Sequence, residues 1–413
     1  MATAVLARPP FFVRLRLAAV QPLISWVGAI AVTLATASTY VRTTMTLDRS
    51  FQPMGDFDAY YRAALDMSHN LDPYLRYNHN IPFSLSLGYI YPPFLARLLE
   101  PLTSLSLNQI HVIALIVLQL SVLASVWLTC KLLALRSWPT RLLILDCFLL
   151  SSGLVSSIQV GNVNVVLVPL TLAWVLAYSR NKDWGWIFVA LNVGLKLTQA
   201  PLFALALFRR EWKGLAIGIA AGLFTILVGG IALTHEFLTT TLPRLTSTVP
   251  TGAQNTSLLA DIERFLHPGS DNLAYDPTFA ESRFLLIPIV LFVLFFTARA
   301  LHRLRDRQLV ALVSLCAVPL FSNYLGAAHL LSLLPIGLLL AFCAWRLRAY
   351  RSLALIGLSL LFIADYALLY TLATALNYFV ARAVFYEVGP GLAAVALWLV
   401  ALRLASLTKS RAS

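Results

Sequence analysis

Residues 55–64 read GDFDAYYRAA and place two carboxylates, Asp56 and Asp58, shortly after a long apolar run. Such groups are scarce elsewhere, since the 413 residues contain only 18 Asp and Glu. If this stretch is helical, Asp56 shares a face with Tyr60, because residues four apart are neighbours on a helix. Two interpretations follow. Either Asp56 caps an amphipathic helix whose dipole Asp58 complements, or the pair forms an acidic site at a membrane face.

The composition indicates an integral membrane protein. Hydrophobic residues make up 59% of the chain and charged residues 12%, whereas soluble proteins carry roughly 25% charged residues. The net charge of +13 comes from basic residues between apolar runs, which is typical of membrane topology and not of nucleic-acid binding. The cysteines form no CxxC pair, so we expect buried hydrophobic side chains and neither a metal site nor disulfides. They are Cys130, Cys147, Cys316 and Cys343.

We expect an all-α, polytopic fold, because apolar runs of about the spanning length of 20 residues recur along the chain. The first run lacks a clear cleavage site and is interpreted as a retained span. The ten expected crossings are 20–41, 109–134, 142–159, 163–179, 213–233, 284–301, 308–323, 328–345, 352–372 and 390–405.

One further apolar stretch, 184–208, is flanked by basic residues on both sides, so both of its ends should face the cytoplasm. It is interrupted at Lys196 and Pro201. We therefore predict a re-entrant pair of half-helices with Lys196 near the tip. A cation in the bilayer centre costs roughly 2.5–3.5 kcal/mol and usually faces a cavity or a partner. The alternative is a lysine that snorkels to the interface.

Seven basic clusters fall on one side of this topology if the N-terminus is cytoplasmic, in agreement with the positive-inside rule. The long loops 42–108 and 234–283 then face outward. We expect amphipathic helix at 56–69 and an interfacial helix at 94–107, within a single membrane domain spanning 1–413. The clusters are Arg8, Arg14 and Arg16; Lys131, Arg136 and Arg141; Arg180 and Lys182; Arg209, Arg210 and Lys213; Arg299, Arg303, Arg305 and Arg307; Arg346, Arg348 and Arg351; and Arg403, Lys409 and Arg411.

Further polar residues are expected on the outer side. GNVN at 161–164 forms a tight turn, in which Asn162 and Asn164 either serve as ordinary turn residues or bind hydroxyls. Asn255 lies in a sequence that matches a glycosylation site. Arg264 is a candidate anion ligand on the helix that follows.

FSNYLGAAHLLSLLP at 321–335 places Asn323, Tyr324 and His329 at the outer end of a helix pair. A lone histidine is more often a structural hydrogen-bonding group than a catalyst. We assign Asp365 and Asn377 structural roles only. A carboxylate, amides, an imidazole and a cation from distant parts of the chain thus converge on one membrane face, which suits a substrate with a lipid tail and an anionic head.

In chain order, these stretches resemble glycosyltransferase family 87, which comprises polytopic enzymes of the GT-C superfamily that use polyprenyl-phosphate sugars. The resemblance covers roughly residues 50–340. It rests on DFDAYYRAA at 56–64, Asp72-Pro73-Tyr74, Tyr91-Pro92-Pro93, GNVN at 161–164, Lys196 ahead of Pro201, Arg209-Arg210-Glu211-Trp212, Asn255-Thr256-Ser257 and His329 before Pro335.

The resemblance implies an inverting glycosyltransferase that faces outward in the cell membrane. Its acceptor would be a lipid or an envelope glycan, and it would have no nucleic-acid partner. Asp56 takes the role of catalytic base, and Asp58 ranks as a second carboxylate. The donor-phosphate ligands would be His329, Lys196 and Arg264. The other substrate-binding candidates are Tyr60, Tyr61, Tyr91, Asn162, Asn164 and Asn255.

The resemblance favours mannose or another hexose as the sugar, because the mannosyltransferase pattern has a histidine where this chain has His329, and the arabinosyl type more often has tyrosine. The segment 323–326 departs from the Ser-Pro-Trp-like stretch of many members. Asp56-Phe57-Asp58 matches the DxD motif that holds a metal with nucleotide sugars in soluble transferases. Nucleotide sugars are cytoplasmic, so we expect neither a metal nor another cofactor.

Three alternatives stay open: an arabinofuranosyltransferase of the same fold, a flippase or other transporter for lipid-linked sugars, and a structural scaffold. A broken helix with a central Lys196 is typical of transport sites. A transporter should line its path through the membrane with polar residues, whereas an enzyme should gather them at one face. A scaffold leaves Asp56 and His329 without a purpose.

The topology predicts that both long loops are accessible from outside. A cysteine introduced at Ser50 or Thr248 should therefore react with a membrane-impermeant thiol reagent in intact spheroplasts. Absence of labelling at both positions, with labelling restored after the membrane is permeabilised, would contradict this orientation.

Overall fold

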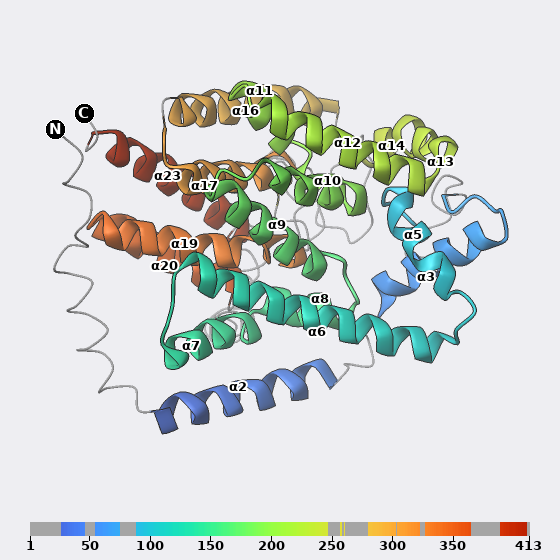
Figure 1. Ribbon diagram of the computed structural model, residues 1–413, viewed down its shortest axis with the longest axis horizontal. Helices are drawn as coiled ribbons and strands as arrows, with labels where there is room; N and C mark the ends of the chain where they lie inside the picture. Colours follow the sequence, from blue (N-terminus) through green and yellow to red (C-terminus); the bar gives the residue numbers. More distant parts are fainter. Residues whose placement is uncertain are drawn as a thin grey trace.

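The chain folds entirely into helices over the residues that the structure, a computed structural model, describes (Figure 1). These residues are 26–45, 54–74, 88–246, 257, 260, 280–302, 304–322, 327–364 and 389–410.

The first half of the chain supplies the helices that carry most of the polar residues considered below. They are α2 (Trp26–Met45), α3 (Gly55–Ser68), α5 (Pro93–Leu99), α6 (Leu107–Leu132), α7 (Trp138–Leu149), α8 (Ser152–Gln159), α9 (Asn164–Ser179), α10 (Trp186–Leu195) and α11 (Leu202–Phe208), with 3-10 turns at Glu100–Leu102, Asp183–Gly185 and Leu197–Gln199.

The second half packs against α9 and completes the core. Its helices are α12 (Trp212–Gly229), α13 (Ile231–Glu236), α14 (Leu242–Thr246), α16 (Ala280–Leu301), α17 (Arg307–Ala317), α18 (Ala327–Leu330), α19 (Leu333–Arg346), α20 (Tyr350–Ala364) and α23 (Gly389–Ser410). A π-helical turn covers Phe237–Thr241, and a 3-10 turn covers Val318–Phe321.

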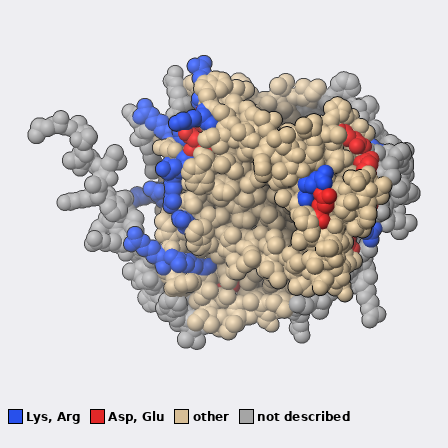
Figure 2. Space-filling model, turned by 45° about the vertical axis from the view of Figure 1, so that its right-hand side comes forward, with Lys and Arg blue, Asp and Glu red and all other residues tan. Residues whose placement is uncertain are grey.

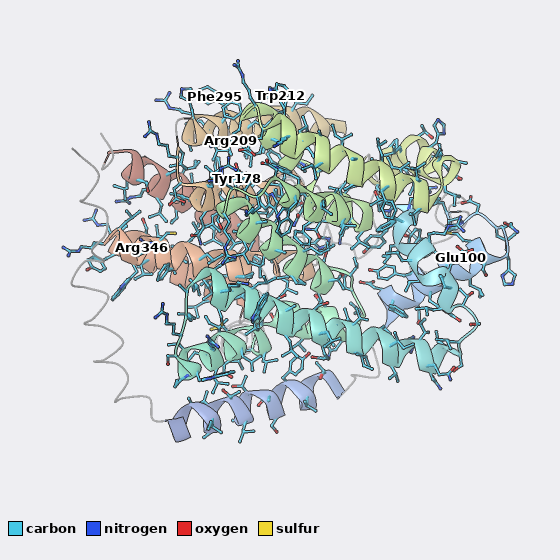
Figure 3. The ribbon with its side chains drawn as sticks, in the orientation of Figure 1. Glu100, Tyr178, Arg209, Trp212, Phe295 and Arg346 are labelled. Atoms are coloured by element: carbon cyan, nitrogen blue, oxygen red, sulfur yellow. The ribbon has the colours of Figure 1, made fainter. Side chains whose placement is uncertain are left out.

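The long helices run along one common direction, and this gives the molecule two distinct ends (Figure 1). Helices α3, α5 and α13 lie at one end, and α23 finishes at the other. Most Lys and Arg side chains visible in Figure 2 gather at the α23 end, and a broad belt without charges separates them from charged side chains at the opposite end. Figure 3 places Arg209 and Arg346 at the basic end and Glu100 at the other. Arg209 and Arg346, which come from two of the predicted basic clusters, therefore lie toward the same end.

The uncharged belt is apolar on its surface. Trp212 is 60% exposed and Phe295 is 59% exposed (Figure 3), and Leu227 on α12 is 65% exposed. Large apolar side chains on an outer surface are expected where lipid, and not water, surrounds the protein. The apolar helices and this belt identify a membrane protein.

The expected number of ten crossings is not confirmed by helix length. Among the described residues, α6, α12 and α23 are long and apolar enough to span a membrane, and α7 with α8 adds a fourth candidate that bends by 59°. The remaining apolar helices are shorter. One source of the difference is a helix break of the kind seen at the 59° bend between α7 and α8, which a hydropathy window does not register.

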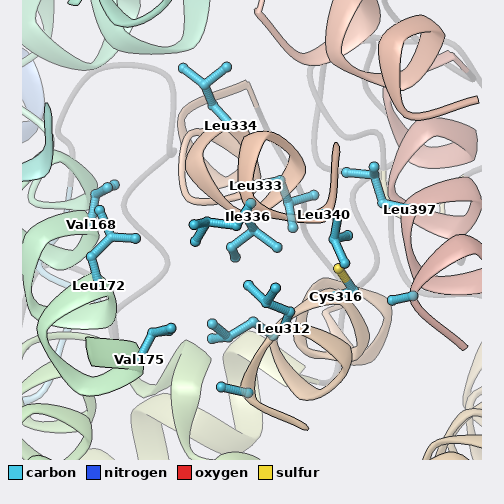
Figure 4. Packing of buried hydrophobic residues seen from close by; sticks show 14 of the residues in the cluster. Val168, Leu172, Val175, Leu312, Cys316, Leu333, Leu334, Ile336, Leu340 and Leu397 are labelled. Carbon is cyan, nitrogen blue, oxygen red and sulfur yellow. The ribbon is translucent and has the colours of Figure 1, made fainter. Parts of the chain in front are cut away.

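The core forms where α9, α17, α19 and α23 meet (Figure 4). Leu172, Leu312, Leu333 and Leu397 have no exposed surface. Cys316 is likewise buried and is a free thiol, as the sequence predicted for a small apolar side chain. This packing fixes the position of α9, whose first residue, Asn164, belongs to the candidate site.

The stretch 184–208 is broken as predicted. Helix α10 ends at Leu195, and Lys196 takes an extended conformation with φ −160° before the next turn begins. Helix α12 packs closely against α10, because a Cβ on Gly194 would lie 2.8 Å from a side-chain carbon of Thr225. The interruption at Lys196 is therefore set within a tightly packed region.

Candidate functional site

The start of α3 is bonded to the end of α8 through the backbone. The N–H of Met54 donates to the carbonyl of Gln159 at 2.8 Å, and the N–H groups of Asp56 and Phe57 donate to the carbonyl of Val160 at 2.9 and 3.2 Å. First-turn N–H groups of a helix have no partner inside it, and here the carbonyl of Val160, after the distant helix α8, supplies one. These bonds hold Asp56 beside the turn that follows α8.

Gly161 in that turn allows the close approach. Its φ is +71°, and a Cβ at this position would lie 2.5 Å from the Cβ of Phe57. Both the left-handed conformation and the contact exclude an ordinary side chain. The absence of a side chain at Gly161 therefore allows α3 to pack against the turn.

Asp56 accepts a hydrogen bond from Asn162. The distance from Asn162 Nδ2 to Asp56 Oδ2 is 2.6 Å. On its other side, Asn162 Oδ1 accepts from the backbone N–H of Asn164 at 2.8 Å. The backbone bond fixes which end of the Asn162 amide is oxygen, so the amide must present its NH₂ to Asp56. This geometry favours the ionised carboxylate as acceptor.

Asp56 is not the cap of α3. The N-cap position is Met54, in a left-handed conformation, and no side chain caps the helix. Burial raises the pKa of the half-buried Asp56 carboxyl above its ordinary value, whereas the hydrogen bond from Asn162 and the charge of Lys196 act in the opposite direction. A carboxylate with a raised pKa is a better proton acceptor than an exposed one.

Lys196 links Asn164 to His329. Its ammonium Nζ donates to Asn164 Oδ1 at 3.1 Å and contacts His329 Nε2 at 2.8 Å. Asp56, Asn162, Asn164, Lys196 and His329 thus form one continuous series of hydrogen bonds, which we call the polar row. The hydrogen bonds bring Lys196 and His329 together and link them to Asp56 through the two asparagines, and the chemical role of each residue stays a prediction.

A second polar cluster supports the helix break. Asn192 Nδ2 donates to Gln199 Oε1 at 2.7 Å and to Thr171 Oγ1 at 3.3 Å, and Gln199 Nε2 donates to the same Thr171 oxygen. These buried side chains tie the segments on either side of Lys196 to α9. Gln199 belongs to the interruption seen in the sequence, whereas Asn192 was not predicted, although it lies four residues before Lys196 in an apolar run.

Tyrosines line the polar row. The ring of Tyr60 meets that of Tyr91 edge to face with centroids 5.0 Å apart, and Lys196 Nζ lies 5.3 Å from the centroid of Tyr91. The Asp72-Pro73-Tyr74 motif holds this arrangement, since the hydroxyl of Tyr74 donates to the carbonyl of Tyr91 at 2.9 Å. Tyr60 is buried and Tyr91 is half-buried, so Tyr91 is the tyrosine that a substrate can contact.

Tyr61 does not join this group. Its hydroxyl donates to the carbonyls of Thr103 and Leu105 at 3.3 and 3.0 Å. Those residues lie in the loop before α6, so Tyr61 connects α3 to that loop by hydrogen bonds. The predicted substrate contact of Tyr61 stays a prediction.

Asp58 also points away from Asp56. Its Oδ1 lies 2.7 Å from Nε2 of His111, near the start of α6. His111 was not predicted, although a histidine near the start of the expected crossing 109–134 could be seen in the sequence. The two acids of the DxD sequence therefore serve different partners.

The part of the chain that the structure describes contains no group of three or more His, Cys, Asp or Glu residues arranged to hold a metal ion. Six residues singled out from the sequence lie outside the described residues. They are Asn255, Arg264, Asn323, Tyr324, Asp365 and Asn377.

The Asn162 bond predicts a pH effect. If Asp56 acts as a base, activity is lost as pH falls through its pKa. Asn162→Ala removes an interaction that lowers this pKa, so the acid limb of kcat/KM should move to higher pH. The exposed Asn108 on α6 gives the control Asn108→Ala, which should leave the profile unchanged. An unshifted acid limb in Asn162→Ala would argue against Asp56 as the titrating base.

Comparison with known proteins identifies the family. The sequence profile of glycosyltransferase family 87 matches residues 89–323. This range contains Asn162, Asn164 and Lys196, whereas Asp56 and His329 lie outside it. No solved structure matches the chain.

Two relatives from Mycobacterium tuberculosis, strains CDC 1551 / Oshkosh and ATCC 25618 / H37Rv, each carry the name alpha-(1->3)-arabinofuranosyltransferase. Each is 26% identical to this chain over 204 residues, or 47% of the chain. The match spans less than half of each relative, namely 45%. With the family profile covering more than half of the chain, the protein belongs to glycosyltransferase family 87.

Proposed function

We propose that the protein moves a sugar from a polyprenyl-phosphate donor to a hydroxyl group of a lipid or envelope glycan, with inversion, at the extracytoplasmic face. The polar row carries this proposal. It begins with a carboxylate that can accept a proton and ends with an ammonium beside an imidazole. An inverting transfer needs a base for the nucleophile and positive charge for the leaving group.

The reaction begins at Asp56. Oδ2 of its carboxylate is held by Asn162, and Oδ1 has no hydrogen bond from the described residues. Oδ1 takes the proton from the acceptor hydroxyl as the hydroxyl oxygen attacks the anomeric carbon. The bond between that carbon and the phosphate oxygen breaks, and polyprenyl phosphate leaves with the electron pair. Attack and departure on opposite sides of the carbon invert its configuration.

The leaving phosphate gains negative charge in this step, and Lys196 supplies the compensating positive charge. Both Lys196 and His329 are half-buried, in a protein whose belt is apolar, so few water molecules compete for the phosphate. His329 accepts from the Lys196 ammonium and thereby orients it. Preorganised donors of this kind stabilise charge that develops in the transition state.

The sugar that we propose is mannose or another hexose, since His329 matches the mannosyltransferase pattern of the resemblance. The names of the two mycobacterial relatives favour arabinofuranose as a second candidate. Both sugars reach an outward-facing site on polyprenyl phosphate in the proposed scheme. A panel of radiolabelled polyprenyl-phosphate donors, offered to the purified protein with extracted lipids, distinguishes them.

A transporter for lipid-linked sugars is the other function that a specific observation favours, because the helix that carries Lys196 is broken. The polar row begins at Asp56 in the first turn of α3, at the end of the molecule opposite the end of α23 (Figure 1). It passes through the first residue of α9 and not along that helix. A site gathered near one end suits surface chemistry better than passage across the membrane.

Asp56→Asn tests the enzyme directly. The amide keeps the size and hydrogen-bonding capacity of the carboxylate but cannot accept a proton at neutral pH. Transfer from the radiolabelled donors should fall by at least about a thousandfold, the scale of general-base catalysis, with normal membrane insertion. Asp58→Asn is the matched control and should be milder, because Asp58 pairs with His111. An inactive Asp58→Asn alongside an active Asp56→Asn would reverse the assignment.

His329→Ala tests the donor end. The loss of the imidazole leaves the Lys196 ammonium without the partner at 2.8 Å, so phosphate stabilisation should suffer mainly in the transition state. We expect kcat to fall by more than tenfold and the KM for the acceptor to stay within about twofold. A raised acceptor KM with unchanged kcat would instead place His329 in acceptor binding.

A further inference from the structure

Asn164 holds a buried hydrogen-bond donor without a partner. The residue is 6% exposed. Its Oδ1 accepts from Lys196 and its backbone N–H donates to Asn162, but its Nδ2 has no hydrogen-bond partner. Leaving a buried amide donor unsatisfied costs about 1–3 kcal/mol, and such groups are rare in folded proteins. An unsatisfied donor within a candidate site indicates a ligand that arrives later.

The orientation of this amide follows from its neighbour. An ammonium has only donors, so the end of the Asn164 amide that faces Lys196 must be the oxygen. A flipped amide would oppose two donors at 3.1 Å. Nδ2 is therefore the free end, and it can only donate. The ligand atom that meets it must be a hydrogen-bond acceptor.

We propose that Asn164 Nδ2 donates a hydrogen bond to a non-bridging oxygen of the donor phosphate, next to the Lys196 ammonium. This assignment rests on the proposed function, because it names the ligand of the same site. Two N–H groups of Lys196 serve Asn164 and His329, and the third is left for the ligand. Nζ and Nδ2 flank the same amide oxygen, so they are close enough to reach two oxygens of one phosphate.

The charge of the site favours phosphate over a sugar hydroxyl as the partner of Nδ2. A hydroxyl oxygen would accept one hydrogen bond but would not neutralise the neighbouring ammonium. A phosphate oxygen does both, and hydrogen bonds to ionised acceptors are the stronger ones. The aromatic ring of Tyr91, 5.3 Å from Nζ, limits the water that can take the same place.

In this proposal, the two asparagines of the turn have different roles. Asn162 faces the base and Asn164 faces the leaving group, and the bond from the Asn164 N–H to Asn162 Oδ1 fixes one relative to the other. Because Gly161 lets α3 approach this turn, a single rigid segment sets the distance between Asp56 and the phosphate. Asn164 is thus a residue specific to the leaving group.

The test uses Asn164→Asp, which keeps the shape and the acceptor for Lys196 but replaces the free NH₂ by an oxygen. The full-length protein in nanodiscs is titrated with undecaprenyl phosphate and, separately, with undecaprenol. We expect the variant to bind undecaprenyl phosphate at least about tenfold more weakly than the wild type, as expected when one charge-assisted hydrogen bond is lost. Undecaprenol binding should not change.

Asn108→Asp, an exposed position on α6, makes the same change in net charge and should bind undecaprenyl phosphate like the wild type. If Asn164→Asp fails to fold, as judged by its thermal unfolding, Asn164→Ala removes the same donor and should show the same loss. Undiminished affinity in a folded Asn164 variant would overturn the inference and leave the proposed function intact. Equal binding of undecaprenyl phosphate and undecaprenol by the wild type would refute the donor class, and the inference with it.

Discussion

The arrangement of the site depends on the need to surround one ammonium, Lys196, with hydrogen-bond acceptors inside an apolar protein. A lysine in such a setting requires acceptors or a cavity. Here, the break after α10 places it in extended backbone, where Asn164 and His329 serve as acceptors. The requirement for these two acceptors brings together the start of α9 and the segment before α19, which are far apart in sequence.

The sequence predicted those parts of the fold that depend on local patterns. The apolar runs, the helix at 56–69, the turn at 161–164 and the interruption at Lys196 all appear, because each is set by composition or by turn residues within a short window. The number of crossings is not confirmed, because a local hydropathy pattern does not show where a helix stops. Hydropathy windows average, for example, across the bend between α7 and α8.

Site contacts between distant segments were harder to predict. Lys196, His329 and Asp56 stood out individually, because polar groups are scarce in this chain. By contrast, the pairing of Asp58 with His111 and the cluster around Asn192 depend on how α6 packs on α3 and how α9 packs on α10, which a single sequence does not encode in any local pattern. The inward direction of Tyr60 and the outward direction of Tyr61 likewise follow from the position of α3.

Apart from His329, on which the proposal of a hexose rests, the polar row contains no group that must distinguish one sugar from another. In the proposed reaction, Asp56 acts on the acceptor hydroxyl, and Lys196 and Asn164 bind the phosphate, and both groups are present whatever sugar ring lies between them. Discrimination between a hexose and arabinofuranose must then come from side chains that contact the ring, and half-buried Tyr91 is the described candidate beside Lys196. In the proposed reaction, the choice of sugar would thus depend on the side chains around the ring more than on the groups that carry out the transfer.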